Sequence, residues 1–202
     1  VELFLPSGPF AMLPMTGRRT NIVWTEKAAL APEFLAMDED TFLAEVQRRF
    51  GDWLGPLTLV GPRFSYPLGL MHASRYTDLR LALIGEAAHV IHPIAGQGFN
   101  LGIRDIAALA EVIVDAMRLG LEPADPSVLD RYETWRRLDN TTLVAVTDIL
   151  NRLFSNDLAP VRMARDAGMA AVGKMPPLKR IFMRHAMGIV GELPRLVRGE
   201  AL

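Results

Sequence analysis

The sequence predicts an α+β fold in which an antiparallel sheet comes first and helices come last. Short β-prone runs separated by turn residues fill the first third of the chain, and segments with apolar residues at helical spacing fill the second half. A strand, a glycine-rich loop and a long helix join these two parts. We therefore expect three regions, over residues 1–78, 79–120 and 121–202.

The first region is expected to be a meander of strands with one helix. Turn residues such as Ser7-Gly8-Pro9 separate the opening apolar runs. A helix is expected from Asp38 to about Phe50, because acidic residues lie in its first turn and Gly51 follows its end. Strands are predicted at 2–5, 10–13, 20–24, 57–60 and 64–66, the last two beside the strand-breaking residues Pro62 and Pro67.

The central region passes from a strand to a helix. The compact apolar run Arg80–Ile84 predicts a strand, and a long helix is expected from about Leu101 to Leu119. Apolar residues at i+3 and i+4 spacing define the face on which this helix should pack, and polar residues fill another face. The expected packed residues are Ile103, Ile106, Ala110, Ile113 and Met117, and the polar ones are Arg104, Glu111, Asp115 and Arg118.

The last region is predicted to be helical. Asp125-Pro126 supplies an N-cap and a proline at the first helical position, so a helix is expected from there to about Phe154. Two shorter helices are expected at about 159–172 and 178–189. The residues expected to be buried in the first helix include Tyr132, Trp135, Val146, Ile149 and Leu153.

Composition argues against several classes of function. Half of the 202 residues are apolar, and the formal net charge of -1 gives no electrostatic signature of nucleic-acid binding. The absence of cysteine excludes disulfides, thiolate metal sites and a cysteine nucleophile, and it fits a cytoplasmic protein. No apolar run approaches the roughly 20 residues that span a bilayer. The chain starts at Val1 rather than Met, which we interpret as a boundary with sequence before it.

Residues 80–105 carry the one strong chemical signal. Gly85, at the end of the predicted strand, has no Cβ and lets a ligand approach closely. Glu86 follows and places a carboxylate where it can accept hydrogen bonds from sugar-like hydroxyls. The run Gly96–Asn100 then leads to a helix N-terminus, whose free N–H groups and dipole favour negative charge.

Three other interpretations of this segment compete. The glycines at 96, 98 and 102 only approximate G-x-G-x-x-G and lie well past the strand, so they could form a plain connection. His89 and His92 could form a metal pair, but no acidic or cysteine partner lies nearby in the sequence, so we predict no metal site. A Ser-His-Asp triad would need a serine in a nucleophile elbow, and none is present.

The segment resembles the second flavin-binding motif of the para-hydroxybenzoate-hydroxylase-type flavoprotein monooxygenases, G-D-A-A-H-x-x-x-P-x-x-G-Q-G-x-N. The one departure is Glu86, which replaces the usual aspartate, keeps its charge and adds a methylene. The resemblance implies FAD as cofactor and NAD(P)H as co-substrate. The matching residues are Gly85, Ala87, Ala88, His89, Pro93, Gly96, Gln97, Gly98 and Asn100. The residues that it implies for cofactor binding are Gly85, Glu86, Pro93, Gly96, Gln97, Gly98, Phe99 and Asn100.

The resemblance is greatest to the ubiquinone-biosynthesis hydroxylases within that family, and it covers nearly the entire chain. It implies hydroxylation of a prenylated phenol with O2. Outside the motif it rests on runs such as Phe4-Leu5-Pro6-x-Gly8-Pro9, Tyr66-Pro67-Leu68, Arg131-Tyr132-Glu133, Arg137-x-Asp139-Asn140, the cluster over 147–157 and Pro176-Pro177-Leu178-Lys179.

Enzymes of this family begin with a strand–G-x-G-x-x-G–helix unit that binds the ADP half of FAD, and this chain contains none. We therefore expect a C-terminal portion that is inactive alone. By resemblance, 1–78 belongs to a substrate-binding sheet, 79–120 to the end of the FAD-binding domain and 121–202 to a helical region. Tyr66 and His72 could line the substrate cavity, with ordinary packing as the alternative, and no catalytic residue is assigned.

Further expectations concern partners. Residues 174–202 interleave basic with apolar residues and could rest on the inner face of an anionic membrane, or instead pack on their own domain. A homodimer could form, with truncation as one cause, through exposed edges and faces. Two other functions stay open: another class of flavin aromatic hydroxylase, and a stand-alone binding or assembly module. The apolar residues of the basic segment include Phe182, Met183, Met187, Ile189 and Leu196.

Overall fold

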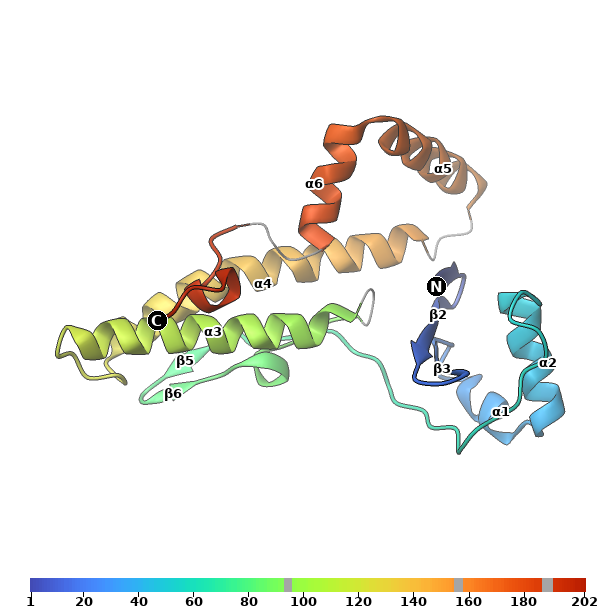
Figure 1. Cartoon of the computed structure of the whole chain (residues 1–202), viewed down its shortest axis with the longest axis horizontal. Coiled ribbons are helices and arrows are strands. Elements are labelled where there is room, and N and C mark those ends of the chain that lie inside the picture. The colour runs from blue at the N-terminus through green and yellow to red at the C-terminus, as the bar shows by residue number, and fades with distance from the viewer. Residues whose placement is uncertain (93–95, 155–157, 187–190) are drawn as a thin grey trace. The chain divides into compact units, whose positions relative to one another are not determined.

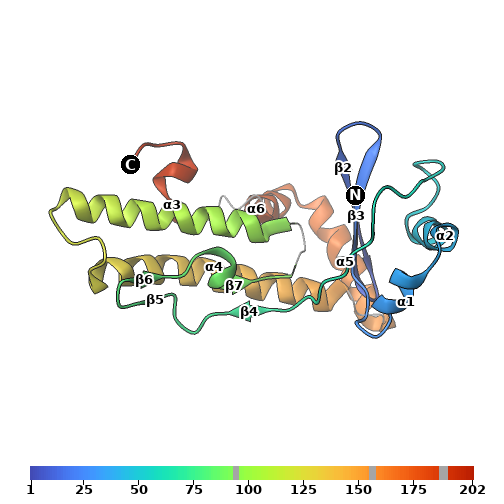
Figure 2. The same cartoon turned by 90° about the horizontal axis from the view of Figure 1, so that it is seen from below.

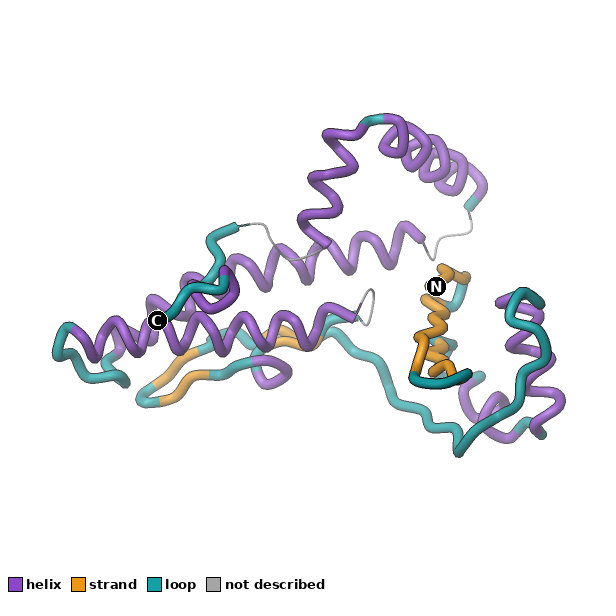
Figure 3. The backbone as a smooth tube through the Cα atoms, viewed as in Figure 1, coloured by secondary structure: helices purple, strands orange, loops and turns teal. Residues whose placement is uncertain are grey.

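The structure, a computed structural model, describes residues 1–92, 96–154, 158–186 and 191–202. The chain divides into two compact units, unit 1 over 1–68 with 154–157 and unit 2 over 69–153 with 158–202. Both units combine helices with strands, and every strand pairing is antiparallel in the part of the chain that the structure describes (Figures 1 and 3). The predicted α+β fold class is confirmed, while the division into three regions stays a prediction.

Unit 1 is built on a three-stranded sheet in the order β1-β2-β3. Its strands are β1 (Glu2–Leu5), β2 (Gly8–Met15) and β3 (Arg19–Trp24), which confirms the three strands predicted at the start of the chain. The register sets Phe10 opposite Trp24. Phe10 is fully buried, and its ring meets the Trp24 ring edge-on with 5.5 Å between centroids.

Two helices complete unit 1, the unpredicted α1 (Ala31–Ala36) and the predicted α2 (Glu39–Phe50). The Asp38 carboxylate accepts a hydrogen bond from the Thr41 N–H at 2.9 Å, and this contact caps α2, a role that the sequence analysis did not assign to Asp38. The apolar face of α2 packs on the sheet. The resulting core consists of Phe10, Met12, Phe42, Val46 and Phe50.

The strands predicted at 57–60 and 64–66 are wrong, because the structure assigns no strand to residues 57–70. The Leu59 N–H donates to the Glu39 carboxylate at 3.1 Å rather than to a neighbouring strand. The Arg63 guanidinium donates to the Phe34 carbonyl at 3.0 Å and lies over the Phe42 ring. The segment is therefore held on α1 and α2 by side chains, which explains extended backbone without a ladder.

Unit 2 opens with short strands that form two small antiparallel pairs. In the first pair, β4 (Met71–His72) lies beside β7 (His89–Val90), and in the second, β5 (Thr77–Asp78) lies beside β6 (Leu81–Ala82). The strand predicted at 80–84 is thus shorter than expected. After β6 the chain forms a single 3-10 turn, η1 (Gly85–Ala87).

The helices of unit 2 follow the predicted order. They are α3 (Gln97–Arg118), α4 (Pro126–Phe154), α5 (Ala159–Lys174), α6 (Pro176–Ala186) and the short η3 (Arg195–Arg198). Figures 1 and 2 both show α3 and α4 running side by side, with the β5–β6 pair along them. None of the helices in the described ranges is long and apolar enough to cross a membrane.

The packed face predicted for α3 is wrong. Ile103, Ile106 and Met117 are exposed, whereas Arg104 and Glu111 are buried. The side of α3 that faces α4 carries small and polar residues, because the contact there includes ion pairs as well as apolar packing. Hydrophobic spacing alone therefore selected the wrong side of the helix. The apolar part of the unit 2 core consists of Tyr76, Ala88, Ala108, Val112, Ala116, Val128 and Tyr132.

The burial predicted for α4 holds only in its N-terminal half. Tyr132 is fully buried and Trp135 is partly buried, as expected. Val146, Ile149 and Leu153 are exposed, so that part of the prediction is wrong. The N-terminal half packs against α3 and the short strands, and this contact provides the burial.

Candidate cofactor-binding site

The turn at Gly85 begins the site. Gly85 has a φ of 57°, in the left-handed region that favours glycine. Its backbone lies against Gly102 of α3, where an added Cβ would sit 3.4 Å from the Gly85 Cα. The missing side chains at Gly85 and Gly102 thus let the turn and the helix approach closely. The sequence analysis explained Gly85 by ligand approach and did not foresee this second reason.

The Glu86 side chain is exposed and lies within the 3-10 turn η1, not directly at the end of a strand as the sequence analysis expected, because β6 already ends at Ala82. Among the described residues, its carboxylate makes no hydrogen bond or ion pair. An unengaged carboxylate can accept hydrogen bonds from hydroxyl groups of a ligand.

The loop after the turn leads to the start of α3. Gly96 precedes the helix with a φ of 61° and, having no side chain, cannot cap the first-turn amides. Gly98 and Phe99 lie in this first turn, and the Phe99 ring is exposed. α3 begins at Gln97 rather than Leu101, so the glycine-rich run is largely part of the helix.

Two other predicted contact residues lie on this first turn. The Asn100 Nδ2 lies 3.4 Å from the Gln97 Oε1, a long hydrogen bond. Pro93, also predicted to contact the cofactor, lies outside the described residues. The structure thus places five predicted residues together at the N-terminus of α3, and their roles stay predictions. They are Gly96, Gln97, Gly98, Phe99 and Asn100.

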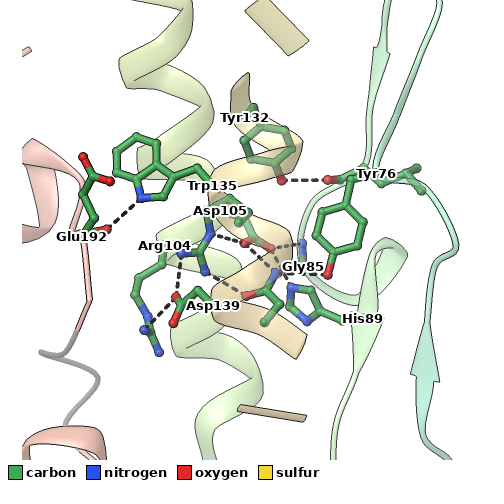
Figure 4. Close-up of polar contacts among 12 residues, drawn as sticks. Tyr76, Gly85, His89, Arg104, Asp105, Tyr132, Trp135, Asp139 and Glu192 are labelled. Atoms are coloured by element: carbon green, nitrogen blue, oxygen red, sulfur yellow. Dashed lines mark hydrogen bonds and ion pairs between the residues drawn. The ribbon is translucent and has the colours of Figure 1, made fainter. Parts of the chain in front are cut away.

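A buried carboxylate, Asp105, lies directly behind the turn (Figure 4). Its Oδ2 accepts a hydrogen bond from the Gly85 N–H at 3.0 Å and lies 2.6 Å from the His89 Nε2. Its Oδ1 accepts from the Arg136 Nε at 2.8 Å and from the Asn140 Nδ2 at 3.2 Å. One oxygen therefore faces the turn and the other faces α4.

Arg136 connects Asp105 with the rest of α4. Its Nη1 donates to Asp139 at 2.7 Å and its Nη2 donates to the Asn140 Oδ1 at 2.8 Å. Asp139 also accepts from Arg104 of α3 at 3.2 Å. All three nitrogens of the Arg136 guanidinium are thus engaged in a buried setting, which is the geometry for which arginine is suited.

Electrostatics keep Asp105 ionised. Burial alone raises the pKa of this carboxyl, but the hydrogen bonds from His89 and Arg136 and the charge of Arg136 outweigh burial. The pKa of Asp105 therefore lies below its ordinary value. The network holds a fixed negative charge beneath the turn.

The network continues toward β4. The Asn140 Nδ2 lies 3.3 Å from the Tyr76 hydroxyl, which lies 2.7 Å from the His72 Nε2. Burial, together with the charges of Arg137 and His89, lowers the pKa of His72. Tyr66, the other predicted substrate residue, is exposed in unit 1, and its role stays a prediction as that of His72 does.

The sequence analysis missed this network. It considered His89 for a metal and found no acidic partner nearby, whereas folding supplies Asp105 from α3. In the described part of the chain, no group of three or more acidic, histidine or cysteine residues could hold a metal ion. Charged residues on the buried side of an otherwise amphipathic helix, here Arg104 and Asp105, were the available signal.

These features fit the ribityl and pyrimidine end of a flavin. The Glu86 carboxylate, exposed and without a partner in the described part of the chain, suits the hydroxyls of a ribityl chain. The first turn of α3, preceded by Gly96, suits the negative charge of a reduced flavin ring. The described residues thus offer polar groups on two sides of one loop.

Comparisons with known proteins identify the family to which the chain belongs. Residues 3–147 match the family described as FAD binding domain. The chain is 58% identical to ubiquinone hydroxylase UbiL of Rhodospirillum rubrum over 100% of this chain and 48% of that protein. It is 38% identical to 3-demethoxyubiquinol 3-hydroxylase of Escherichia coli, over 93% of this chain and 48% of that protein. The chain spans about half the length of these curated relatives.

A solved structure supports the fold. It is that of pqsL, a probable FAD-dependent monooxygenase from Pseudomonas aeruginosa, with a TM-score of 0.64 and 25% sequence identity. The similarity covers 77% of this chain and 44% of that one. The match over residues 3–147 takes in both the sheet of unit 1 and the turn, α3 and most of α4 of unit 2. The chain belongs to the FAD-binding domain family.

Proposed function

We propose that the chain is the C-terminal portion of an FAD-dependent monooxygenase that hydroxylates the aromatic ring of a polyprenyl phenol in ubiquinone biosynthesis. The observation that carries the proposal is the exposed Glu86 carboxylate, which has no partner among the described residues and stands on a turn that lies against α3 at Gly102, in a chain of the FAD-binding family. Relatives named as ubiquinone and demethoxyubiquinol hydroxylases supply the substrate class. NAD(P)H and O2 are the co-substrates in this proposal.

Each site residue has a role in the proposal. Glu86 accepts hydrogen bonds from the ribityl hydroxyls, and Gly85 lets the chain turn toward them. Residues 96–100 and Pro93 contact the flavin ring, whose negative charge the N-terminus of α3 stabilises. FAD supplies the electrons, taken from NAD(P)H, with which O2 gives one oxygen atom to the ring and one to water. Tyr66 and His72 are each a candidate for contact with the substrate, with ordinary packing as the alternative.

An FAD titration tests the proposal. Quenching of flavin fluorescence is measured for this chain and for the full polypeptide that its gene encodes. We expect tight binding by the full polypeptide, weak or no binding by the 202-residue chain, and loss of binding on Glu86→Ala. Glu122→Ala is the matched control, because Glu122 is another exposed carboxylate of unit 2 and pairs with Arg80, away from the turn.

The outcomes separate the alternatives. If neither form binds FAD, the flavin proposal fails and a stand-alone binding or assembly module becomes the first hypothesis. If FAD binds and survives Glu86→Ala, only the role of Glu86 fails. Oxidation of NAD(P)H that is stimulated by a simple phenol but not by a prenylated one would indicate another class of flavin aromatic hydroxylase.

We also propose that the enzyme works in the cytoplasm and contacts the inner face of the membrane through part of 174–202. Met175 and Met183 are exposed, and so are the cations of Lys179 and Arg180, which suits an anionic lipid surface. Arg195 does not serve this purpose, because it forms ion pairs with α3. The side chain of Phe182 and residues 187–190 lie outside what the structure describes.

Vesicle co-sedimentation tests the membrane contact. We expect binding to phosphatidylglycerol vesicles, little binding to phosphatidylcholine, and loss of binding on Lys179→Glu with Arg180→Glu. The control is Arg18→Glu with Arg19→Glu, which reverses two exposed charges in unit 1. Equal binding by both double variants would contradict the proposed contact.

A homodimer of the 202-residue chain is also proposed. The exposed stripe of Phe99, Ile103, Ile106 and Met117 on α3 offers an apolar face of the kind that self-associates. Sedimentation velocity should show a dimer that Ile103→Lys converts to a monomer. A monomer at every concentration would contradict this proposal.

A further inference from the structure

We propose that Asp105 is a positioning residue for the cofactor, which it never touches. Its Oδ2 contacts both ends of the 85–89 turn, at the Gly85 N–H and the His89 imidazole. Glu86 lies between these two points. Asp105 thereby fixes where the ligand-facing carboxylate stands, and this inference rests on the proposed role of Glu86.

The turn is fixed to α3 at two places on one side of the helix. Gly102 and Asp105 are three residues apart in α3, so they face the same way. At Gly102 the turn comes so close that an added Cβ would lie 3.4 Å from the Gly85 Cα, and at Asp105 a carboxylate accepts the Gly85 N–H. Contact at Gly102 sets the distance of the turn from the helix, and the hydrogen bond sets its rotation.

The Asp105 carboxylate is itself held in one orientation. Arg136 and Asn140 of α4 bind its second oxygen, so the carboxylate cannot rotate without breaking buried hydrogen bonds. The side chains of Asp105 and Arg136 are 0% and 1% exposed. Water is therefore excluded from the pair, and the directional bonds determine the geometry.

Asp105 and Glu86 have different proposed roles: Glu86 contacts the ligand, and Asp105 holds the turn that carries Glu86. Glu86 is exposed and unpaired among the described residues, so nothing in its own surroundings fixes its position. Gly85 is the residue just before it, and its left-handed conformation is held by the bond to Asp105. A change at Asp105 should therefore act on cofactor affinity through the backbone of the turn.

The test compares Asp105→Asn with Glu111→Gln in the full polypeptide. Glu111 is a matched control, because it is a buried carboxylate of the same helix that binds Arg195 instead of the turn. We expect Asp105→Asn to weaken FAD binding by at least about tenfold, the effect of losing one hydrogen bond to a charged group. Glu111→Gln should change FAD affinity by less than about twofold, since it has no partner in the turn.

A second readout does not depend on FAD. Amide hydrogen exchange of the peptide covering residues 83–90 is measured in the cofactor-free protein. Asp105→Asn should accelerate exchange there, and Glu111→Gln should not. A merely structural role for Asp105 would lower the melting temperature of Asp105→Asn without selectively accelerating exchange in residues 83–90.

Arg136→Lys is a second test variant, to be used if Asp105→Asn does not fold. Lysine keeps the buried cation but loses the fork that orients Asp105, so we expect faster exchange in 83–90 and weaker FAD binding than in the parent protein. The inference is overturned if the parent protein binds FAD and Asp105→Asn and Arg136→Lys bind it as tightly as the parent does, with unchanged hydrogen exchange in residues 83–90. If the parent itself fails to bind FAD, the proposed function fails instead.

Discussion

The two units of the chain are stabilised in different ways. Unit 1 has a core of aromatic and aliphatic side chains around Phe10 and Val46, both fully buried. Unit 2 adds to its apolar cluster a buried ionic network centred on Asp105 and Arg136. Apolar packing depends mainly on volume and tolerates exchange, whereas buried ionic contacts depend on direction and charge balance. The difference places the stricter chemical requirement behind the proposed cofactor loop.

Two arginines show the contrast in one residue type. Arg49 in unit 1 lies over the Trp24 ring at 4.3 Å and the Phe34 ring at 5.2 Å, and it also forms an ion pair with Glu45. Arg136 in unit 2 uses the edge of its guanidinium, donating to three polar side chains. Arg49 therefore divides its contacts between aromatic rings and a carboxylate, whereas Arg136 donates to polar side chains. The following predictions test this comparison.

The largest expected effect comes from Arg136→Met. This substitution leaves the Asp105 carboxylate buried without its cation, which costs about 3–5 kcal/mol in comparable pairs. Unfolding in urea is followed by the fluorescence of Trp135, the tryptophan of unit 2, after Trp24 and Trp53 of unit 1 are changed to phenylalanine.

The matched control for that experiment is Arg137→Met. Arg137 is the next residue of α4, and its side chain is 40% exposed beside Glu133. Its loss should cost less than about 1 kcal/mol, as for other exposed pairs. Equal losses of unfolding free energy in Arg136→Met and Arg137→Met would contradict the importance of directional buried contacts in unit 2.

A smaller effect is expected from acid. The folded pKa of Asp105 lies below its unfolded value, about 3.9, so its ionised form stabilises unit 2 at every pH above that value. This stability is lost as the pH falls through the folded pKa. The free energy of unfolding, followed by Trp135 fluorescence, should therefore decline between pH 5 and 3 in the parent protein. It should decline less in Asp105→Asn. Parallel curves would contradict a low folded pKa.

The smallest effect is expected from Met12→Leu in the core of unit 1. Met12 is 4% exposed, and leucine conserves its volume closely. The substitution should cost less than about 1.5 kcal/mol, measured by Trp24 fluorescence during urea unfolding. A loss as large as that of Arg136→Met would show that the unit 1 core is as strict as the unit 2 network.

The same contrast explains what could be predicted from the sequence. The α2 helix and the three opening strands follow from local signals, namely acidic residues in the first helical turn with Gly51 after the helix, and short apolar runs between turn residues. The packed side of α3 did not follow, because its apolar stripe through Ile103 and Ile106 is exposed while Arg104 and Asp105 are buried. A periodicity argument assumes that burial selects apolar residues, and a buried ionic network breaks that assumption.

The candidate site divides in the same way. The candidate flavin-motif residues from Gly85 to Asn100 could be proposed from the sequence, because they lie in one short stretch that resembles a family motif, and their roles stay predictions. The partners of Asp105 come from residues 85, 89, 136 and 140, and only folding brings them together. One sequence contains no record of which distant polar residues pair, so the network could not be derived.

The close approach of Gly102 to Gly85 sets a size limit that protein engineering should respect. Glycine inside a helix is less stable than alanine by about 0.5–1 kcal/mol, so a designer would choose to replace Gly102. Alanine would place its Cβ 3.4 Å from the Gly85 Cα, at the near limit of ordinary contact. Valine or leucine would force the turn away from α3. Position 102 therefore accepts at most one added carbon atom before the turn that carries Glu86 must move away from α3.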